Sequence, residues 1–335
     1  MKALLIGLGE MGRAWYRALA ARSDMVLVGV ADANPATWEK IVADDAAASA
    51  RPDEKIPANP PCAFFTDAAA AMDELRPDFI VNVTPPHVHL RINGLAFERN
   101  IPVLCEKPIA ESAADVRAIL EYAHGQKLMI AENYRYMAQI RHIKSLLDEN
   151  HVGEIQSVNI FFSRRHSMTN YHRDMEHPLL LDVTIHHLDM LRYLAGDEAE
   201  SVFADFFTPA GSWYKGYSNA SLSIKMANGA RVLYGGSLDA HENSTDWYGD
   251  WTIRGTKATL KYANDRLTSC DGQQSVPLPL PENTDDGMGA ILDNWLAFLQ
   301  GGALPATHIS DNMKTDAIAR AALRSFRTKE DQPCP

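Results

Sequence analysis

The chain has 335 residues, a length that predicts two domains or one large one. Apolar residues make up 46% of it and charged residues 22%, which excludes a disordered chain, a collagen-like repeat and a small disulfide-held scaffold. The formal net charge of −11 argues against nucleic acid or an anionic membrane as the main partner. A local basic pocket for a small anion remains compatible with that charge.

The four cysteines stand singly in the sequence, at Cys62, Cys105, Cys270 and Cys334. Because none lies near enough to another to suggest a metal clip or a redox pair, we expect free thiols in a reducing compartment. The first residues carry too short an apolar run for a secretory leader, and no stretch approaches 18 uncharged apolar residues. We therefore expect a cytoplasmic protein.

Short apolar runs alternate with helical patterns over the first 130 residues. The expected strands are Ala3–Ile6, Val26–Ala31, Phe79–Val83, Val103–Cys105 and Leu128–Ala131. The expected helices are Met11–Ala21, Ala36–Ala48, Ala68–Leu75, His89–Arg99 and Ala113–His124. The proline-rich stretch Pro52–Cys62 is expected to be a loop. This alternation predicts an α/β domain with a doubly wound parallel sheet.

After about residue 150, the pattern changes to successive short strands with turn residues between them. The expected strands are Val158–Phe162, Ser201–Phe207, Ala220–Met226, Arg231–Ser237, Trp251–Arg254 and Thr259–Tyr262. The expected helices are Leu179–Leu194, Met288–Gln300 and Asp311–Arg327. This pattern predicts an α+β domain with a large, mostly antiparallel sheet. We place the two domains at residues 1–125 and 126–335, and the C-terminal helix could pack back on the first domain.

Gly7, Gly9 and Gly12 form a G-x-G-x-x-G pattern that includes Glu10 and Met11. The pattern follows the first expected strand and opens the first expected helix, which is the context of a dinucleotide-binding loop. The first glycine permits a tight turn, the second lets a pyrophosphate approach, and the third lets the helix pack on the strand. The N-terminus of the helix offers N–H groups to the phosphates.

Asp32 ends the second expected strand, 20 residues after Gly12 (32 − 12). This is the spacing of a carboxylate that binds the ribose 2′-hydroxyl of a dinucleotide. Because an acid there repels a 2′-phosphate, NAD is favoured over NADP. The alternative is that the glycines form only a tight turn and that Asp32 only caps the following helix.

Two further segments follow strands at their carboxyl ends, where ligands bind in open α/β sheets. Thr84, Pro85 and His89 follow one strand, and Glu106 and Lys107 follow the next. We expect these residues to line the cofactor site, and Lys107 is also a candidate cation for the substrate. The alternative for Lys107 is a surface lysine.

With these motifs in place, the chain resembles the family of oxidoreductases named after glucose–fructose oxidoreductase, inositol dehydrogenase and MocA. The matching pieces are GLGEMG at 7–12, Asp32, TPPHVH at 84–89, EKP at 106–108, ENYR at 132–135, GEI at 153–155, DVTIHHLD at 182–189 and IRGT at 253–256. The resemblance implies an N-terminal Rossmann domain and hydride exchange between a nicotinamide and a sugar, inositol or related polyol. It also implies a homodimer or homotetramer formed through the open face of the C-terminal sheet.

Asp182, His186 and Asp189 are spaced to lie near one face of a helix. An aspartate one turn before a histidine can accept the ring N–H, which leaves the other ring nitrogen free to act as a general base. The resemblance places the family's catalytic aspartate, histidine and lysine at Asp182, His186 and Lys107. Where the family has a glycine two residues after this aspartate, the chain has Thr184, so the substrate wall is expected to differ.

Three alternatives stay open for the same helix. His187 points about 100° away from His186 and is expected to be a core or supporting histidine. Asp189 either orients a neighbour or is a hydrogen-bonded buried polar group. Asp182, His186 and Asp189 have a spacing that a metal ion could use, although no further ligands stand out and the resemblance implies no metal.

The substrate-side candidates come from two stretches. Arg164, Tyr171 and Arg173 lie in a stretch rich in arginine, histidine and tyrosine before the catalytic helix, and Asn133 and Arg135 lie in the ENYR match. We expect a polyol pocket there, together with Lys107 and the catalytic aspartate and histidine, in which arginine can also bind an anionic group. The alternative is a solvated loop that pairs with the acidic surface.

The sequence thus predicts an NAD-dependent dehydrogenase of a sugar, cyclitol or sugar acid. A second hypothesis is a redox-assisted glycosidase or epimerase-like enzyme that recycles a tightly held cofactor. A third is a catalytically silent NAD-binding regulator, against which the intact Lys107, Asp182 and His186 argue.

Overall fold

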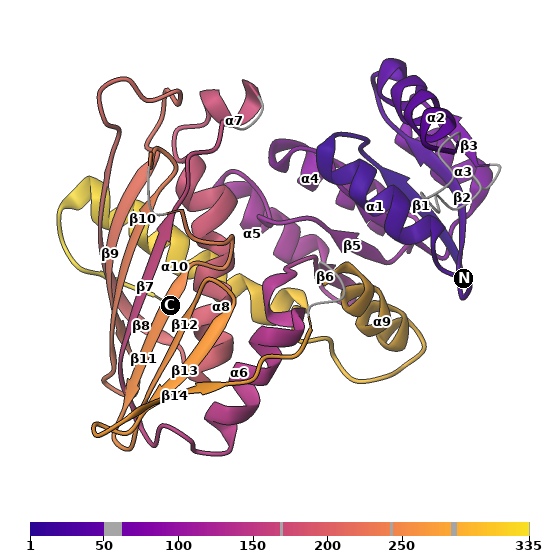
Figure 1. The fold of residues 1–335 in the computed structure, drawn as a ribbon. Helices are drawn as coiled ribbons and strands as arrows, with labels where there is room; N and C mark the ends of the chain where they lie inside the picture. Colours follow the sequence, from indigo (N-terminus) through magenta and orange to yellow (C-terminus); the bar gives the residue numbers. More distant parts are fainter. Residues whose placement is uncertain (50–61, 168–169, 242–243, 283–286, 335) are drawn as a thin grey trace. The chain divides into compact units, whose positions relative to one another are not determined.

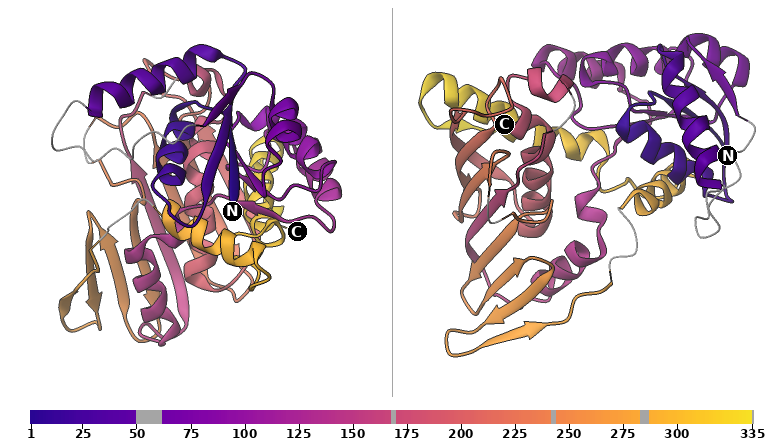
Figure 2. Two further views of the ribbon diagram at one scale, coloured as in Figure 1. Left: turned by 90° about the vertical axis from the view of Figure 1, so that its right-hand side faces the viewer. Right: turned by 45° about the horizontal axis from the view of Figure 1, so that its top comes forward.

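The computed structural model describes residues 1–49, 62–167, 170–241, 244–282 and 287–334, so most of the expected proline-rich loop lies outside the described residues. The chain divides into two compact units (Figures 1 and 2), each of which is described by itself. Unit 1 contains Met1–Ala131 and Met288–Ile309, and unit 2 contains Glu132–Gly287 and Ser310–Pro335. Residues 288–309, which the sequence analysis assigned to the second domain, therefore belong with the first unit.

Unit 1 holds a six-stranded parallel sheet in the order β3-β2-β1-β4-β5-β6. Its strands are β1 Lys2–Ile6, β2 Val26–Ala31, β3 Ala63–Phe65, β4 Phe79–Asn82, β5 Val103–Cys105 and β6 Leu128–Ile130. Its helices are α1 Glu10–Ala20, α2 Pro35–Ser49, α3 Ala68–Leu75, α4 His89–Phe97, α5 Ala113–Tyr122 and α9 Met288–Leu299. The predicted doubly wound domain is confirmed, and strand ends differ from the expected ones by one or two residues.

The central strands of unit 1 are buried on both faces, which explains their continuous apolar sequences. Every residue of β4 and β5 is buried, and β1 is buried from Ala3 onward. The sequence analysis missed β3, because three residues directly after the proline-rich stretch are too few to establish a strand pattern.

Unit 2 holds a nine-stranded sheet in the order β14-β13-β12-β11-β7-β10-β9-β8-β15. Its strands are β7 Ile155–Ser163, β8 Ala199–Phe207, β9 Asn219–Met226, β10 Arg231–Ser237, β11 Asp250–Gly255, β12 Thr259–Ala263, β13 Arg266–Cys270, β14 Ser275–Leu278 and β15 Gln332–Pro333. Neighbouring strands are antiparallel except for β7 and β10, which are parallel. The predicted large, mostly antiparallel sheet is confirmed.

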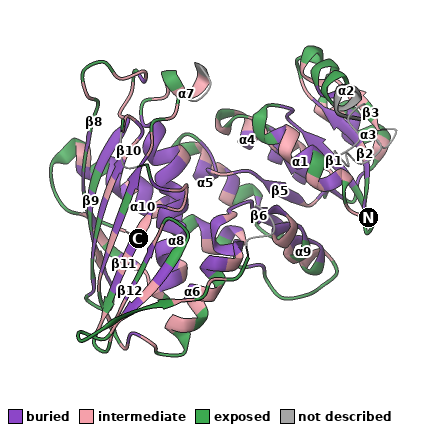
Figure 3. Cartoon of the chain, in the orientation of Figure 1, coloured by how far each residue is buried: buried purple, intermediate pink, exposed green. Residues whose placement is uncertain are grey.

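The helices of unit 2 are α6 Ala138–Asp148, α7 Asn170–Asp174, α8 Ile185–Ala195 and α10 Ile309–Thr328. The views of Figures 1 and 2 agree that α6 and α8 lie on one face of the sheet. Burial alternates along many of these strands, which is visible as changing colours in Figure 3. In β7, Val158, Ile160 and Phe162 are buried while Phe161 is exposed, because successive side chains of a strand point to opposite faces of the sheet. One face of the sheet is therefore covered by helices and the other is not.

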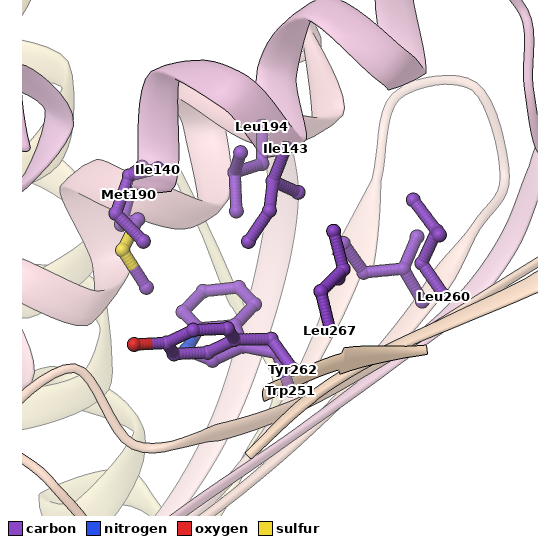
Figure 4. A pocket seen from close by; sticks show the side chains of 9 residues that line it. Ile140, Ile143, Met190, Leu194, Trp251, Leu260, Tyr262 and Leu267 are labelled. Atoms are coloured by element: carbon purple, nitrogen blue, oxygen red, sulfur yellow. The ribbon is translucent and has the colours of Figure 1, made fainter. Parts of the chain in front are cut away.

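Between α6, α8 and strands β11–β13 lies a small apolar cavity (Figure 4). Its volume of about 10 Å³ is barely that of one water molecule. Apolar side chains such as Ile143, Met190 and Trp251 line it. It is therefore a gap in core packing rather than a ligand site. No helix within the described ranges is both long and apolar enough to cross a membrane.

The predicted helix 179–194 is present, but it begins differently from the expectation. Residues Leu179–Thr184 form a π-helical turn (η3), and the α-helix proper starts at Ile185. A π-turn adds one residue per turn, and such turns are frequent at functional sites. Asp182 lies in this π-turn and His186 in the α-helix, so the backbone between them does not have the regular α-helical geometry that the sequence analysis assumed.

Candidate active site

The glycine loop of unit 1 shows which glycines the protein itself needs. Gly7 has φ +96°, and a Cβ there would lie 2.5 Å from the Val83 carbonyl oxygen. A Cβ on Gly12 would lie 2.2 Å from the Gly7 carbonyl oxygen. A Cβ on Gly9, in contrast, would meet no described atom within 4 Å. Open space is thus left beside Gly9, at the N-terminus of α1, where a pyrophosphate could approach.

Gly9 is the N-cap of α1 and supplies no side-chain hydrogen bond to the first turn, where Glu10 and Met11 are exposed. The N–H groups of that turn are therefore not satisfied by a capping side chain, which suits an anionic ligand. These features fit the phosphates of a dinucleotide.

Asp32 lies directly beside the glycine loop. Its Oδ2 accepts the Leu8 N–H at 2.7 Å and its Oδ1 accepts the Asn34 N–H at 2.8 Å. These bonds fix the carboxylate at the loop, and each oxygen keeps a second lone pair for a ribose hydroxyl. The geometry is compatible with both the ribose contact and the capping alternative considered from the sequence.

The segment after β4 begins with two accessible residues. Thr84 is half-buried and donates its hydroxyl hydrogen to Asn82 Oδ1 at 2.7 Å. Pro85 is exposed and is the N-cap of the 3-10 turn Pro86–Val88 (η1). Both can therefore reach a ligand at this edge of the sheet.

His89, expected to contact the cofactor, is instead fully buried. Its Nε2 lies 2.7 Å from the Thr84 carbonyl oxygen, and its Nδ1 lies 3.0 Å from that of Pro108 and 3.2 Å from that of Ile109. Burial lowers the pKa of His89. The ring therefore joins the loop after β4 to the loop after β5. The expectation of a direct cofactor contact is corrected, because the ring has no accessible atom to offer.

Glu106 and Lys107 follow β5. The Glu106 carboxylate is buried and accepts the Trp15 indole N–H at 2.6 Å and the Lys107 backbone N–H at 3.1 Å. Because Trp15 belongs to α1, this carboxylate connects the glycine-loop helix to the backbone of Lys107. Glu106 thus holds together two segments that are expected to bind the cofactor, the glycine-loop helix and the loop after β5. The Lys107 side chain is half-buried.

In unit 2, three residues build the surroundings of His186. The Glu132 carboxylate, which has no exposed surface, is hydrogen-bonded to His186 Nδ1. The Tyr134 ring stacks on the imidazole with 4.2 Å between ring centres and 15° between planes. The ring of Tyr134 also packs edge to face with that of Tyr248, with 4.9 Å between ring centres. The imidazole is therefore held by a carboxylate at one nitrogen and by an aromatic face.

From the sequence, Asp182 was expected either to orient His186 or to bind an adjacent substrate hydroxyl. In the structure the carboxylate on His186 Nδ1 is that of Glu132. Glu132 belongs to the ENYR match, of which only the three following residues were considered. Nothing in the sequence around Glu132 indicates that its side chain contacts a histidine 54 positions later. Asp182 lies in the π-turn with its side chain 23% exposed, and its Oδ1 is 3.7 Å from His172 Nε2.

His187 and Asp189 are buried supporting residues, in line with the plainer alternatives. His187 Nε2 donates to the Trp247 carbonyl oxygen at 2.9 Å, and burial lowers the pKa of His187 to about 3. Asp189 accepts two hydrogen bonds from Arg135. Arg135 was expected to bind substrate, but its side chain is only 5% exposed and is engaged in ion pairs. That expectation is corrected.

The other substrate-side candidates are not brought into one cluster by the contacts described. Arg164 donates to the Thr245 carbonyl oxygen at 2.9 Å and lies over the Trp247 ring at 4.7 Å. Arg173 is exposed and donates to the Trp213 carbonyl oxygen at 3.2 Å. Asn133 and Tyr171 are half-buried. Across the described ranges, no group of three histidine, cysteine or acidic side chains could hold a metal ion.

Comparisons with known proteins agree with this arrangement. Residues 1–134 match the oxidoreductase family with an NAD-binding Rossmann fold, and residues 140–261 match the GFO/IDH/MocA C-terminal domain. The chain is 27% identical to inositol 2-dehydrogenase of Rhizobium meliloti, over 97% of this chain and 96% of that protein. It is 25% identical to D-apiose dehydrogenase of Rhizobium rhizogenes, over 78% of this chain and 80% of that protein.

Among solved structures, an oxidoreductase from Agrobacterium radiobacter in complex with NAD⁺, L-tartaric acid and magnesium superposes with a TM-score of 0.88. The match covers 100% of this chain and 98% of that chain at 21% identity, and so concerns the fold. The family match is to an NAD-binding Rossmann fold, which supports NAD as the cofactor. The chain belongs to the GFO/IDH/MocA oxidoreductases and is an NAD(P)-dependent dehydrogenase.

Proposed function

We propose that this enzyme oxidises a hydroxyl carbon of a sugar, cyclitol or sugar acid with NAD⁺, using His186 as the general base. The observation that carries the proposal is the Glu132–His186–Tyr134 arrangement. Glu132 accepts the hydrogen on Nδ1, so the neutral ring presents its lone pair at Nε2. An ionised carboxylate on Nδ1 also stabilises the imidazolium that forms when Nε2 takes a proton.

The chemistry balances in one step. His186 Nε2 takes the proton of the substrate hydroxyl, the C–H bond electrons leave with the hydrogen as hydride, and a carbonyl forms at that carbon. NAD⁺, when bound, accepts the hydride. In the reducing direction, His186 returns the proton.

Lys107 is proposed to donate a hydrogen bond to the reacting substrate oxygen. An ammonium there stabilises the negative charge that develops on this oxygen. Support comes from the backbone of Lys107, which Glu106 fixes, and from the half-buried position of the side chain. Asp182 is proposed to bind a neighbouring hydroxyl, since its side chain is 23% exposed and Glu132 already serves the imidazole. Contacts to substrate by Asn133, Arg164, Tyr171 and Arg173 stay predictions.

The names of the relatives favour a polyhydroxylated substrate, since they refer to inositol and D-apiose. The direct test is a screen for cofactor reduction across inositols, aldoses, sugar acids and glycosides, with NAD⁺ and NADP⁺ in parallel. The proposal expects reduced NAD to accumulate with at least one polyol. Turnover without net reduction would favour the enzyme that recycles its cofactor, and firm NAD⁺ binding without any turnover would favour the regulator. A preference for NADP⁺ would contradict the role of Asp32.

We further propose that the enzyme self-associates through the outer face of the unit 2 sheet. Phe161 is 50% exposed, Leu233 56% and Phe207 50%, all on strands whose other face packs on helices. Contiguous exposed apolar side chains mark interaction surfaces. Light scattering should give a lower mass for Leu233→Lys together with Phe161→Lys, while Met313→Lys, at an exposed methionine on α10, should leave the mass unchanged. An unchanged mass in the double variant would contradict this interface.

A further inference from the structure

The segment that supplies Glu132 and Tyr134 to His186 ends in a buried arginine. Arg135 Nε donates to Asp189 Oδ2 at 2.6 Å, and its Nη2 donates to Asp189 Oδ1. Its Nη1 lies 3.1 Å from Asp311 Oδ2, at the start of α10. The guanidinium is therefore held in the planar, two-point geometry that arginine makes with a carboxylate.

Residues 132–135 thus meet α8 at two points. Glu132 bonds to His186, and Arg135 bonds to Asp189, three residues further along the same helix. Residues three apart on an α-helix lie on the same side. The arginine consequently fixes the segment next to the imidazole, on the helix that carries it.

Several charged groups surround this contact. Glu132 and Asp189 have no exposed surface and the Arg192 side chain is 3% exposed, while Asp311 on α10 is 33% exposed. The titratable groups close to the segment and its histidine include Tyr134, which interacts with Tyr248, Asp182 and Asp246, and His187, which neighbours His186. Thr315 of α10 also donates its hydroxyl to Asp189 at 3.0 Å. Burial raises the pKa of Asp189 and the nearby Glu132 carboxylate raises it further, whereas Arg135 and Arg192 lower it.

Two buried carboxylates, Glu132 and Asp189, therefore depend on nearby cations to remain ionised together. Two like charges in one site raise the pKa of at least one of them unless a cation compensates. Arg135 supplies that compensation with direct contact to Asp189, whereas Arg192 is 4.0 Å from it and makes shorter contacts with Glu198 and Asp311.

We propose that Arg135 is a positioning residue for the Glu132–His186 pair: it anchors residues 132–135 on α8 and, by neutralising Asp189, keeps Glu132 ionised against the imidazole. The inference rests on the proposed role of His186 as the base. Arg135 touches neither substrate nor cofactor in this account. A buried ion pair is by itself weak evidence of stabilisation. We therefore assign the Arg135–Asp189 pair a role in positioning residues 132–135.

The test compares the dependence of kcat/KM on pH for the wild type and three variants of the NAD⁺-saturated enzyme, using the polyol found in the screen. In Arg135→Met, Asp189 loses its compensating cation, and the proposal expects Glu132 to take up a proton, so that His186 loses its anionic partner. Because an ionised partner favours the protonated ring, the acidic limb of the profile should move to lower pH by about one unit, and kcat should fall roughly 10- to 100-fold.

Arg135→Lys keeps the positive charge but loses the two-point geometry. We expect its acidic limb to stay in place while kcat falls severalfold. In Arg135→Met combined with Asp189→Asn, one buried anion is removed together with the cation, so the limb should return to the wild-type position.

NAD⁺ affinity, measured by titration, should be unchanged in all three variants, since these residues lie in unit 2 and the glycine loop lies in unit 1.

Different outcomes overturn the proposal in different ways. A lower kcat with an unmoved limb in Arg135→Met would mean that the arginine only supports the fold. A raised KM with unchanged kcat would return Arg135 to the substrate site. If Arg135→Met does not fold, the lysine variant decides, because a displaced limb there would contradict charge compensation and an unmoved limb with reduced kcat would support it. His186→Ala is measured alongside. Turnover near the wild-type rate in that variant would mean that the proposed base is wrong, whereas a large loss there together with a contrary result at Arg135 would mean that only the role of Arg135 is wrong.

Discussion

The candidate sites of the two units differ in whether backbone or side-chain atoms form them. In unit 1 the proposed cofactor loop depends on backbone: close contacts with backbone atoms leave no room for a Cβ at Gly7 or Gly12, whereas the space beside Gly9 is open. In unit 2 the candidate catalytic site depends on side chains from separate elements, namely Glu132, Tyr134 and His186. The residues of a backbone site are consecutive in the sequence and can be recognised there. The residues of a side-chain site are far apart in the sequence and are brought together by packing.

The largest effect expected from this difference is at Gly12. In Gly12→Ala, the new Cβ would meet the Gly7 carbonyl oxygen at 2.2 Å, so the backbone must shift. We expect the free energy of unfolding to fall by roughly 2–4 kcal/mol, measured by urea denaturation. Gly9→Ala is the matched control, because its Cβ meets no described atom within 4 Å.

Gly9→Ala should therefore keep its stability within about 0.5 kcal/mol and lose NAD⁺ affinity by roughly tenfold. If Gly9→Ala bound NAD⁺ as tightly as the wild type, the space beside Gly9 would not be the pyrophosphate site.

A smaller effect is expected when the carboxylate of the unit 2 site is made neutral. Glu132→Gln keeps the shape of the side chain but cannot stabilise an imidazolium by charge. We expect kcat to fall roughly 10- to 100-fold with unchanged NAD⁺ affinity. Equal kcat values for the variant and the wild type would show that Glu132 only packs against His186.

The last effect is on the stability of unit 2 at acid pH and not on catalysis. His177 precedes the π-turn and packs between Tyr217 at 4.9 Å and Phe206 at 5.0 Å. Burial lowers the pKa of His177 to about 4, from 6.5 in the unfolded chain. Between these two pH values the unfolded chain binds a proton that the folded protein does not, so stability is full above pH 6.5 and is lost as the pH falls towards 4.

His177→Phe removes this titration, so it should lose about 2 kcal/mol less than the wild type on going from neutral pH to about pH 4.5. Urea denaturation of both proteins at the two pH values measures the difference. Parallel losses in the two proteins would mean that His177 is protonated in the folded state.

These differences explain how much the sequence could predict. Five strands of the parallel sheet, the glycine loop and six strands of the antiparallel sheet follow from short-range patterns, and their ends were predicted to within three residues. The short strands β3 and β15 and the hairpin strands β13 and β14 were missed. The helix α6 was missed although its apolar residues Ile140, Ile143, Leu146 and Leu147 have helical spacing, so this segment was within reach of the sequence. The π-turn has no sequence pattern of its own.

The site was less predictable than the fold. His186 was singled out by its motif, but its partner Glu132 was not, because their bond depends on how a segment without regular pattern packs on α8. Arg135 and His89 were assigned to ligands on the strength of residue type and motif. Burial, which the sequence does not display, gives both of them supporting roles instead.

The central claim is that His186 exchanges the substrate proton. It is tested most directly by comparing polyol-dependent reduction of NAD⁺ in the wild type and in His186→Ala, with NAD⁺ affinity measured by titration in both. The account predicts that affinity stays the same while turnover falls by roughly 10²- to 10⁴-fold. Turnover near the wild-type rate in His186→Ala would contradict it.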